Sequence, residues 1–101
     1  MQKGISLDTV CKHSQDIIAR EIASELIMIP ISSGTGDLEE VIFTLNGTGK
    51  EIWDAINGER TVREVALEIS RAYKHTPIRL IEEDVLGLTL ELLKRNIVIC
   101  L

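Results

Sequence analysis

The chain has 101 residues, a formal net charge of −5, 45% hydrophobic residues and only 3% aromatic ones. This length fits one small domain, and the composition predicts an aliphatic core of Ile, Leu and Val. The negative charge argues against general nucleic-acid binding, which needs a basic patch. No apolar run reaches the ~18 residues of a membrane span, and the N-terminus lacks the apolar core of a secretory signal.

The cysteine usage points to neither a metal site nor a disulfide scaffold. Cys11 and Cys100 lie near opposite ends of the chain, without a Cys-x-x-Cys motif or a His at ligand spacing. We therefore expect a cytoplasmic protein with reduced thiols.

The N-terminal half predicts an arm followed by strands. Residues 1–15 are polar and weakly patterned, which favours a flexible arm, and a single domain is expected over residues 16–101. Residues 16–23 (DIIAREIA) suit an exposed strand, and residues 25–31 (ELIMIPI) form an apolar run of strand length. Between them, Ser24-Glu25 is a candidate hairpin turn.

A loop over residues 32–37 precedes a third predicted strand over residues 41–45 (VIFTL). Both of its faces are mostly apolar, which is unusual in a small sheet with one solvated face. Alternation places Val41, Phe43 and Leu45 on one face, and Ile42 and Thr44 on the other.

Two short helices are predicted next. Asn46 is a suitable N-cap for the first helix, which should end at Asn57-Gly58, where Gly58 can adopt the left-handed conformation. The second helix begins with a capping box, in which Thr61 is the N-cap and Glu64 the third helical residue.

A longer third helix should begin at Thr76-Pro77, because Pro suits the first helical turn, and extend to about Arg95. The apolar residues 97–101 are a candidate for a further short strand. Three strands followed by three helices indicate an α+β fold, in which a three-stranded antiparallel sheet precedes a three-helix bundle.

The apolar arc of the third helix is wider than a one-sided surface helix needs. The extra width packs either on the first helix or the C-terminal tail, or it forms a wall for a partner. A wheel count at about 100° per residue gives two stripes. The core stripe holds Ile78, Ile81, Val85, Leu88 and Leu92, and the second stripe holds Glu82, Leu86, Thr89 and Leu93, with Leu90 just beyond.

The sequence offers no catalytic or metal-binding motif. Neither His13 nor His75 has a Cys, Asp or Ser nearby in a nucleophile motif, so we expect both on the surface. The carboxylates of residues 82–84 fan out by about 100° each on a helix, so they do not converge on a metal ion. We therefore expect a protein that is not an enzyme and that has no cofactor.

An edge position for the third strand would suit peptide binding. Its free backbone N–H and C=O groups could pair with an extended peptide, while an apolar helix alongside would supply side-chain pockets.

Several motifs between Asp16 and Leu101 occur in a distinctive order and spacing. They are Leu45-Asn46-x-Thr48-Gly49-x-x-Ile52-Trp53, Asn57-Gly58-x-x-Thr61-Val62-x-Glu64, Glu83-Asp84-Val85 and Asn96-Ile97-Val98. Together they resemble the PqqD-like family, which takes its name from the D protein of pyrroloquinoline quinone biosynthesis. Many members of the family serve other peptides.

The resemblance implies a winged-helix-like precursor-peptide recognition element. Such a domain binds the leader of a ribosomally synthesised peptide and presents it to a modifying enzyme, often a radical SAM protein, or to a leader peptidase in lasso-peptide systems. The leader is implied to add as a strand to the third strand, in a cleft beside the third helix. With the helix face taken from the wheel count, the expected peptide-binding residues are Val41, Ile42, Phe43, Thr44, Leu45, Leu86, Thr89, Leu90 and Leu93.

Two alternatives remain open at this point. The helical part could belong to a winged-helix DNA-binding transcriptional regulator, although residues 82–84 would bring acidic side chains to the phosphates. The chain could also be a subunit that only scaffolds an enzyme complex. An exposed strand edge would further permit a homodimer.

Overall fold

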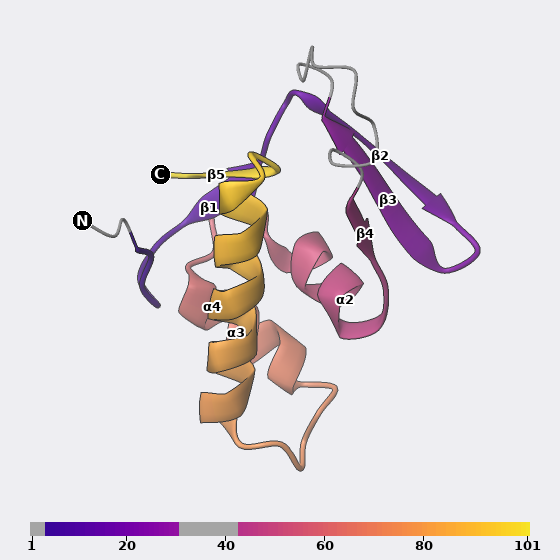
Figure 1. Cartoon of the computed structure of the whole chain (residues 1–101). Helices are drawn as coiled ribbons and strands as arrows, with labels where there is room; N and C mark the ends of the chain where they lie inside the picture. Colours follow the sequence, from indigo (N-terminus) through magenta and orange to yellow (C-terminus); the bar gives the residue numbers. More distant parts are fainter. Residues whose placement is uncertain (1–3, 31–42) are drawn as a thin grey trace.

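The computed structural model describes residues 4–30 and 43–101, which form two small antiparallel sheets and three helices (Figure 1). The larger sheet has the strand order β2-β3-β4. Its strands are β2 (Ile17–Ile22), β3 (Glu25–Pro30) and β4 (Phe43–Leu45). The three predicted strands are therefore present, although Val41 and Ile42 lie outside the described residues.

The helices follow the larger sheet in the chain, as predicted for an α+β fold. They are α2 (Gly47–Ala55), α3 (Val62–Ser70) and α4 (Ile78–Lys94). None of the helices in the described part of the chain is long and apolar enough to cross a membrane.

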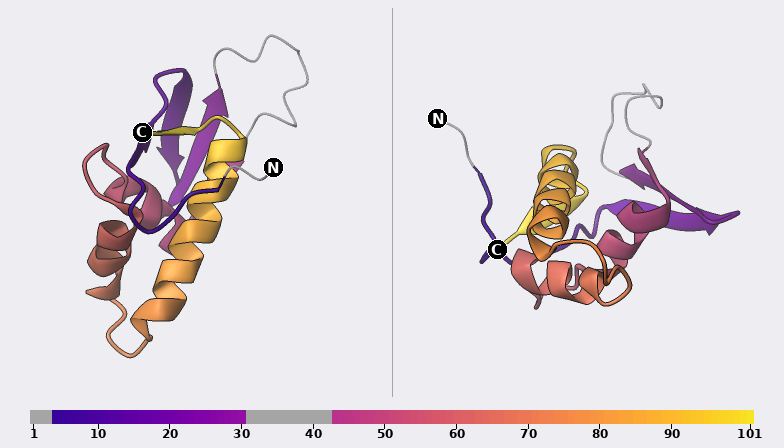
Figure 2. Two further views of the ribbon diagram at one scale, coloured as in Figure 1. Left: turned by 90° about the vertical axis from the view of Figure 1, so that its left-hand side faces the viewer. Right: turned by 90° about the horizontal axis from the view of Figure 1, so that it is seen from below.

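A tight hairpin connects β2 to β3, and all six residues of each strand are paired. The turn lies at Ala23 and Ser24, one residue earlier than predicted, and both residues have positive φ angles (52° and 73°). Positive φ at both central residues gives the turn the twist that a two-residue hairpin favours. The hairpin projects beyond the helices (Figures 1 and 2).

Local sequence signals set the helix ends. The capping box of α3 is present, since the Thr61 side chain accepts from the Glu64 N–H (3.1 Å) and Glu64 Oε1 accepts from the Thr61 N–H (2.9 Å). Asn46 occupies the N-cap of α2 without a side-chain cap hydrogen bond, and α2 ends at Ala55 rather than at Asn57. Pro77 is the N-cap of α4, close to the predicted start.

The core lies between the inner face of the larger sheet and the helices. Ala66, Val85 and Leu92 are fully buried, and Met28 of β3 contributes the largest of the fully buried side chains. Burying each large aliphatic side chain stabilises the fold by roughly 1.5–3 kcal/mol. Ile78 was expected in this core but is 40% exposed, because it is the first residue of α4 and lies at the end of the buried stripe.

The expected flexible arm over residues 1–15 differs from the structure at its C-terminal end. There β1 (Cys11–His13) pairs with β5 (Val98–Cys100), the strand that the apolar tail suggested. The preceding residues also bind α3, because the Leu7 and Thr9 carbonyl oxygens accept from the first backbone N–H groups of that helix (2.9 Å each). The arm prediction missed these contacts because their partners are distant in sequence.

The pairing of β1 with β5 places Cys11 directly opposite Cys100, and the two form a disulfide. This overturns the expectation of two free thiols, which rested on their separation in sequence. The second cysteine lies 89 residues after the first, so only the folded chain brings them together.

His13 is also not the solvated side chain that the sequence suggested. Its ring stacks on the Trp53 indole of α2, with centroids 3.5 Å apart and an interplanar angle of 3°. Its Nε2 lies 2.8 Å from the Trp53 carbonyl oxygen. Because a carbonyl oxygen only accepts, Nε2 must carry the proton.

Two glycines should respond in opposite ways to alanine. Gly58 has φ +84°, and a Cβ there would lie 3.3 Å from Lys12 Cβ, so Gly58→Ala should destabilise the fold by about 1–2 kcal/mol. Gly87 lies inside α4 with nothing within 4 Å of a Cβ, so Gly87→Ala should stabilise the fold by about 1 kcal/mol. Urea unfolding of the two variants measures both changes in the free energy of unfolding. Equal changes would contradict the prediction that only Gly58 needs to be a glycine.

Candidate functional site

β4 is an edge strand, because it pairs with β3 on one side and with no other strand of the described residues. Its register places Phe43 opposite Met28 and Leu45 opposite Leu26. An edge strand presents a row of unpaired N–H and C=O groups that another strand can use. The free edge of β4 is the first part of the candidate site.

The side chains of β4 alternate between the core and solvent. Leu45 is buried and Phe43 is half-buried, and both pack on the core side of the sheet. Thr44 is exposed and lies opposite Ile27, on the outer face. A strand added to β4 would therefore meet Phe43 on its core-facing side and Thr44 on its outer side.

Two contacts show which side of α4 is turned toward β4. The Arg95 guanidinium lies over the Phe43 ring, 4.7 Å from its centroid. Leu88 and Leu45 both approach Gly49 of α2, where a Cβ would lie 3.0 Å from Leu45 Cδ2 and 3.8 Å from Leu88 Cδ2. The Leu88–Arg95 side of α4 is thus next to the open strand.

The helix residues expected to bind peptide lie elsewhere on α4. At about 100° per residue, Leu86 and Leu93 point roughly 140–160° away from Leu88. Both are half-buried and pack against the core, and Leu90 is also half-buried. Thr89 is only 1% exposed, so it is not accessible to a peptide.

The Leu86 side of α4 faces the N-terminal part of the chain. The pKa of Arg63 in α3 is raised, first by its hydrogen bond to Asp8 and by the charge of Asp8, and to a smaller extent by the charge of Glu82. Glu82 lies one helical turn before Leu86, so this side of α4 is turned toward Arg63 and Asp8. Figures 1 and 2 place the segment before β1 beside α4 on the side away from β4. The structure therefore brings Phe43 and Leu45 together with Arg95 and Leu88, and not with the predicted helix residues, while Thr44 lies on the outer face of the sheet.

The sequence could not identify Leu88 and Arg95 as site residues. The wheel count placed Leu88 in the core stripe and Arg95 in neither stripe, and a wheel gives no direction toward β4. The Glu91–Arg95 spacing allows an i,i+4 ion pair that would hold the Arg95 side chain, but it does not indicate that Arg95 lies beside β4.

A small cavity of about 110 Å³ lies between the three helices, one turn of α4 before Leu88. Half of its lining residues are aliphatic, and the others are polar or aromatic; among these, the Thr48 hydroxyl lies 3.0 Å from the Tyr73 hydroxyl. The lining residues are Thr48, Ile52, Ile69, Tyr73, Thr76, Ile81, Asp84 and Val85.

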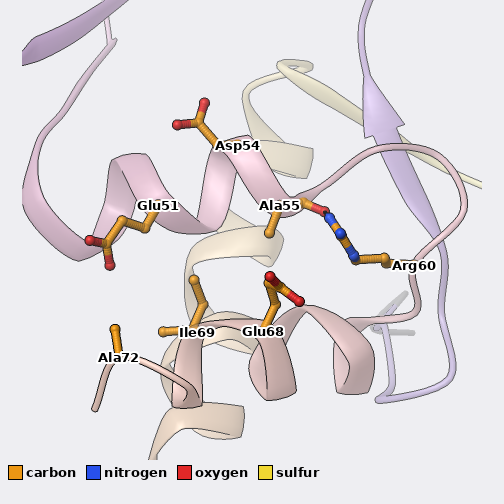
Figure 3. A pocket seen from close by; sticks show the side chains of 7 residues that line it. All are labelled: Glu51, Asp54, Ala55, Arg60, Glu68, Ile69 and Ala72. Carbon is orange, nitrogen blue, oxygen red and sulfur yellow. Dashed lines mark hydrogen bonds between the residues drawn. The ribbon is translucent and has the colours of Figure 1, made fainter.

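A larger pocket, of about 320 Å³, lies between α2 and α3 (Figure 3). Arg60 donates to the Ala55 carbonyl oxygen (3.0 Å), while the carboxylates of Glu51, Asp54 and Glu68 point in different directions around it. Paired catalytic carboxylates need to face one reacting group, so this arrangement does not suggest an active site.

Comparison with known proteins agrees with this architecture. Residues 25–98 match the family described as coenzyme PQQ synthesis protein D (PqqD). A solved structure entitled "TbiB1 in Complex with the TbiA(beta) Leader Peptide" has the same fold, with a TM-score of 0.71 and 20% sequence identity. The match covers 86% of this chain and 93% of the other. No curated protein sequence gives a significant match. The family match spans most of the chain, which therefore belongs to the PqqD family.

Proposed function

We propose that this protein binds the leader segment of a ribosomally synthesised precursor peptide and presents it to a modifying enzyme. The observation that carries the proposal is the open edge of β4 beside the Leu88–Arg95 side of α4. Membership of the PqqD family supports it, as does the similar fold of a protein whose structure contains a leader peptide.

Strand addition fits the chemistry of this surface. The backbone groups of β4 supply hydrogen bonds that any extended peptide can use, so they provide affinity. Phe43 and Leu88 both pack against the core. They would therefore contact the core-facing side of an added strand and select apolar side chains there. Val41 and Ile42, which directly precede Phe43 in the chain, are also proposed as peptide-binding residues.

In this proposal the protein acts as a peptide chaperone and not as an enzyme. Its partner would carry the chemistry, either as a radical SAM enzyme or as a leader peptidase. Within this proposal we place the protein in the cytoplasm, where precursor peptides are synthesised. A second copy of the chain is not needed for binding, since one β4 edge accepts one strand.

Titration of ¹⁵N-labelled protein with synthetic leaders of precursor peptides encoded beside its gene tests the proposal. We expect saturable shifts of the backbone amides of Phe43, Thr44 and Leu45, and of Leu88. The amides of β2, on the opposite edge of the sheet, serve as an internal control. If no leader shifts the β4 signals, or if the β2 signals move instead, the proposed binding mode is wrong.

A further inference from the structure

Arg95 lies at the edge of the proposed peptide site, where the end of α4 meets β4. It follows the last residue of α4, and its guanidinium stacks on the half-buried Phe43 ring of β4 at 4.7 Å. Stacking of a planar guanidinium on an aromatic ring holds the group in place while leaving its edges open to hydrogen-bond partners.

One edge of the guanidinium is already used within α4. Arg95 Nε donates to Glu91 Oε2 at 2.8 Å, and no other described residue forms a hydrogen bond or ion pair with this guanidinium. The terminal Nη1 and Nη2 groups are therefore two donors without a partner among the described residues. Their fork geometry matches a carboxylate.

The Arg95 side chain is 42% exposed, so it is reachable from solvent while being held from two sides. Glu91 and Phe43 fix its position from the helix and from the strand. Because the Arg95 side chain is already held in place, it loses less conformational entropy when a partner binds.

The reach of an added strand includes this group. A residue directly opposite Phe43 would have its Cβ about 4.5–5.5 Å from the Phe43 Cβ, and a diagonal neighbour on the same face about 7–8 Å away. An Asp or Glu side chain at either position can extend toward the guanidinium that covers the Phe43 ring.

We infer that Arg95 is a specificity residue that selects peptides with an acidic side chain opposite Phe43 or at a diagonal neighbour of that position. This inference rests on the proposed leader binding and names the chemistry of the leader: an apolar strand with a carboxylate on its core-facing side. Leu88 and Leu45 would contact the apolar part, and Arg95 would pair with the carboxylate.

The test is a double-mutant cycle with isothermal titration calorimetry. The probes are an N-acetylated synthetic leader from the neighbouring precursor gene and its single Asp→Asn and Glu→Gln copies. Arg95→Gln should weaken binding of the native leader about 3- to 10-fold, because a partly exposed, charge-assisted pair is lost. One amide copy should show the same loss with the wild-type protein and no further loss with Arg95→Gln.

Arg79→Gln is a matched control, because Arg79 also forms an i,i+4 pair within α4, with Glu83, but lies at the other end of the helix. It should leave the affinity unchanged. A specific signature is a shift of the Arg95 Nε–H resonance that appears with the native leader and disappears with the amide copy.

The outcomes separate the two proposals. If the wild-type protein binds no leader, the proposed function fails. If it binds the native leader and Arg95→Gln binds equally well, or if a leader without an acidic residue binds with undiminished affinity, only the role of Arg95 is overturned. Equal losses in Arg95→Gln and Arg79→Gln would also overturn it, since they would indicate a general charge effect.

Discussion

Reduction of the Cys11–Cys100 disulfide is expected to lower the free energy of unfolding by about 4 kcal/mol, because the bond closes a loop across a sequence separation of 89 residues. Opening so long a loop restores much conformational entropy to the unfolded chain. The strands joined by this bond have only three residues each, so their pairing alone replaces little of the lost constraint. For a chain of this size, the melting temperature should fall by roughly 20 °C.

Differential scanning calorimetry with and without dithiothreitol measures this effect. The double variant Cys11→Ala/Cys100→Ser should melt near the temperature of the reduced wild type and should not respond to the reductant. An unchanged melting temperature of the wild type in reductant would contradict the stabilising role of the bond. In a reducing compartment the protein would exist in the less stable thiol form.

The sequence predicted the elements that depend on local signals. The β2 and β3 strands follow from two runs of β-branched and apolar residues separated by a short turn. The start of α3 follows from the Thr61 capping box, and the start of α4 from Pro77. These signals act over a few residues, so the sequence is sufficient to identify them.

The β1–β5 ribbon escaped prediction because nothing near β1 identifies its partner. Each strand is too short for a clear alternation, and the residues that order the N-terminal segment lie in α3, α2 and β5. The stacking of His13 on Trp53 has the same origin. Contacts between distant parts of the chain appear only when the fold is known.

Of the two surfaces that form the candidate site, the strand edge was suggested by the sequence, whereas the peptide-binding role of its residues stays a prediction. Residues 41–45 are apolar on both faces, which is unusual for a strand of a small sheet with one solvated face. The structure places the described part of this strand at a sheet edge. The helix side was different, because a wheel count gives angles between residues but no direction relative to the sheet. Only the contacts of Leu88 with the Gly49 region and of Arg95 with Phe43 supply that direction.

Phe43→Asp is expected to weaken leader binding at least tenfold, which corresponds to about 1.4 kcal/mol. The substitution removes an aromatic contact from the core-facing side of the open strand and places a charge where an apolar cross-strand pair would form. The fold should persist, because Phe43 is only half-buried and the new carboxylate lies within reach of Arg95. Calorimetric titration with the synthetic leader measures the affinity, and a ¹H–¹⁵N spectrum checks the fold.

Thr44→Asp is the matched control for this prediction, since it adds the same charge to the same strand but on the exposed outer face. It should change the affinity less than threefold, because the β4 backbone and the core-facing contacts are preserved. A matching pair on α4 distinguishes the two helix assignments: Leu88→Asp should weaken binding strongly if the β4 side is used, and Leu86→Asp if the wheel-derived side is used. Equal affinity in Phe43→Asp and wild type would remove β4 from the site, whatever the helix variants do. A large loss in Thr44→Asp alone would instead place the bound peptide on the outer face of the sheet.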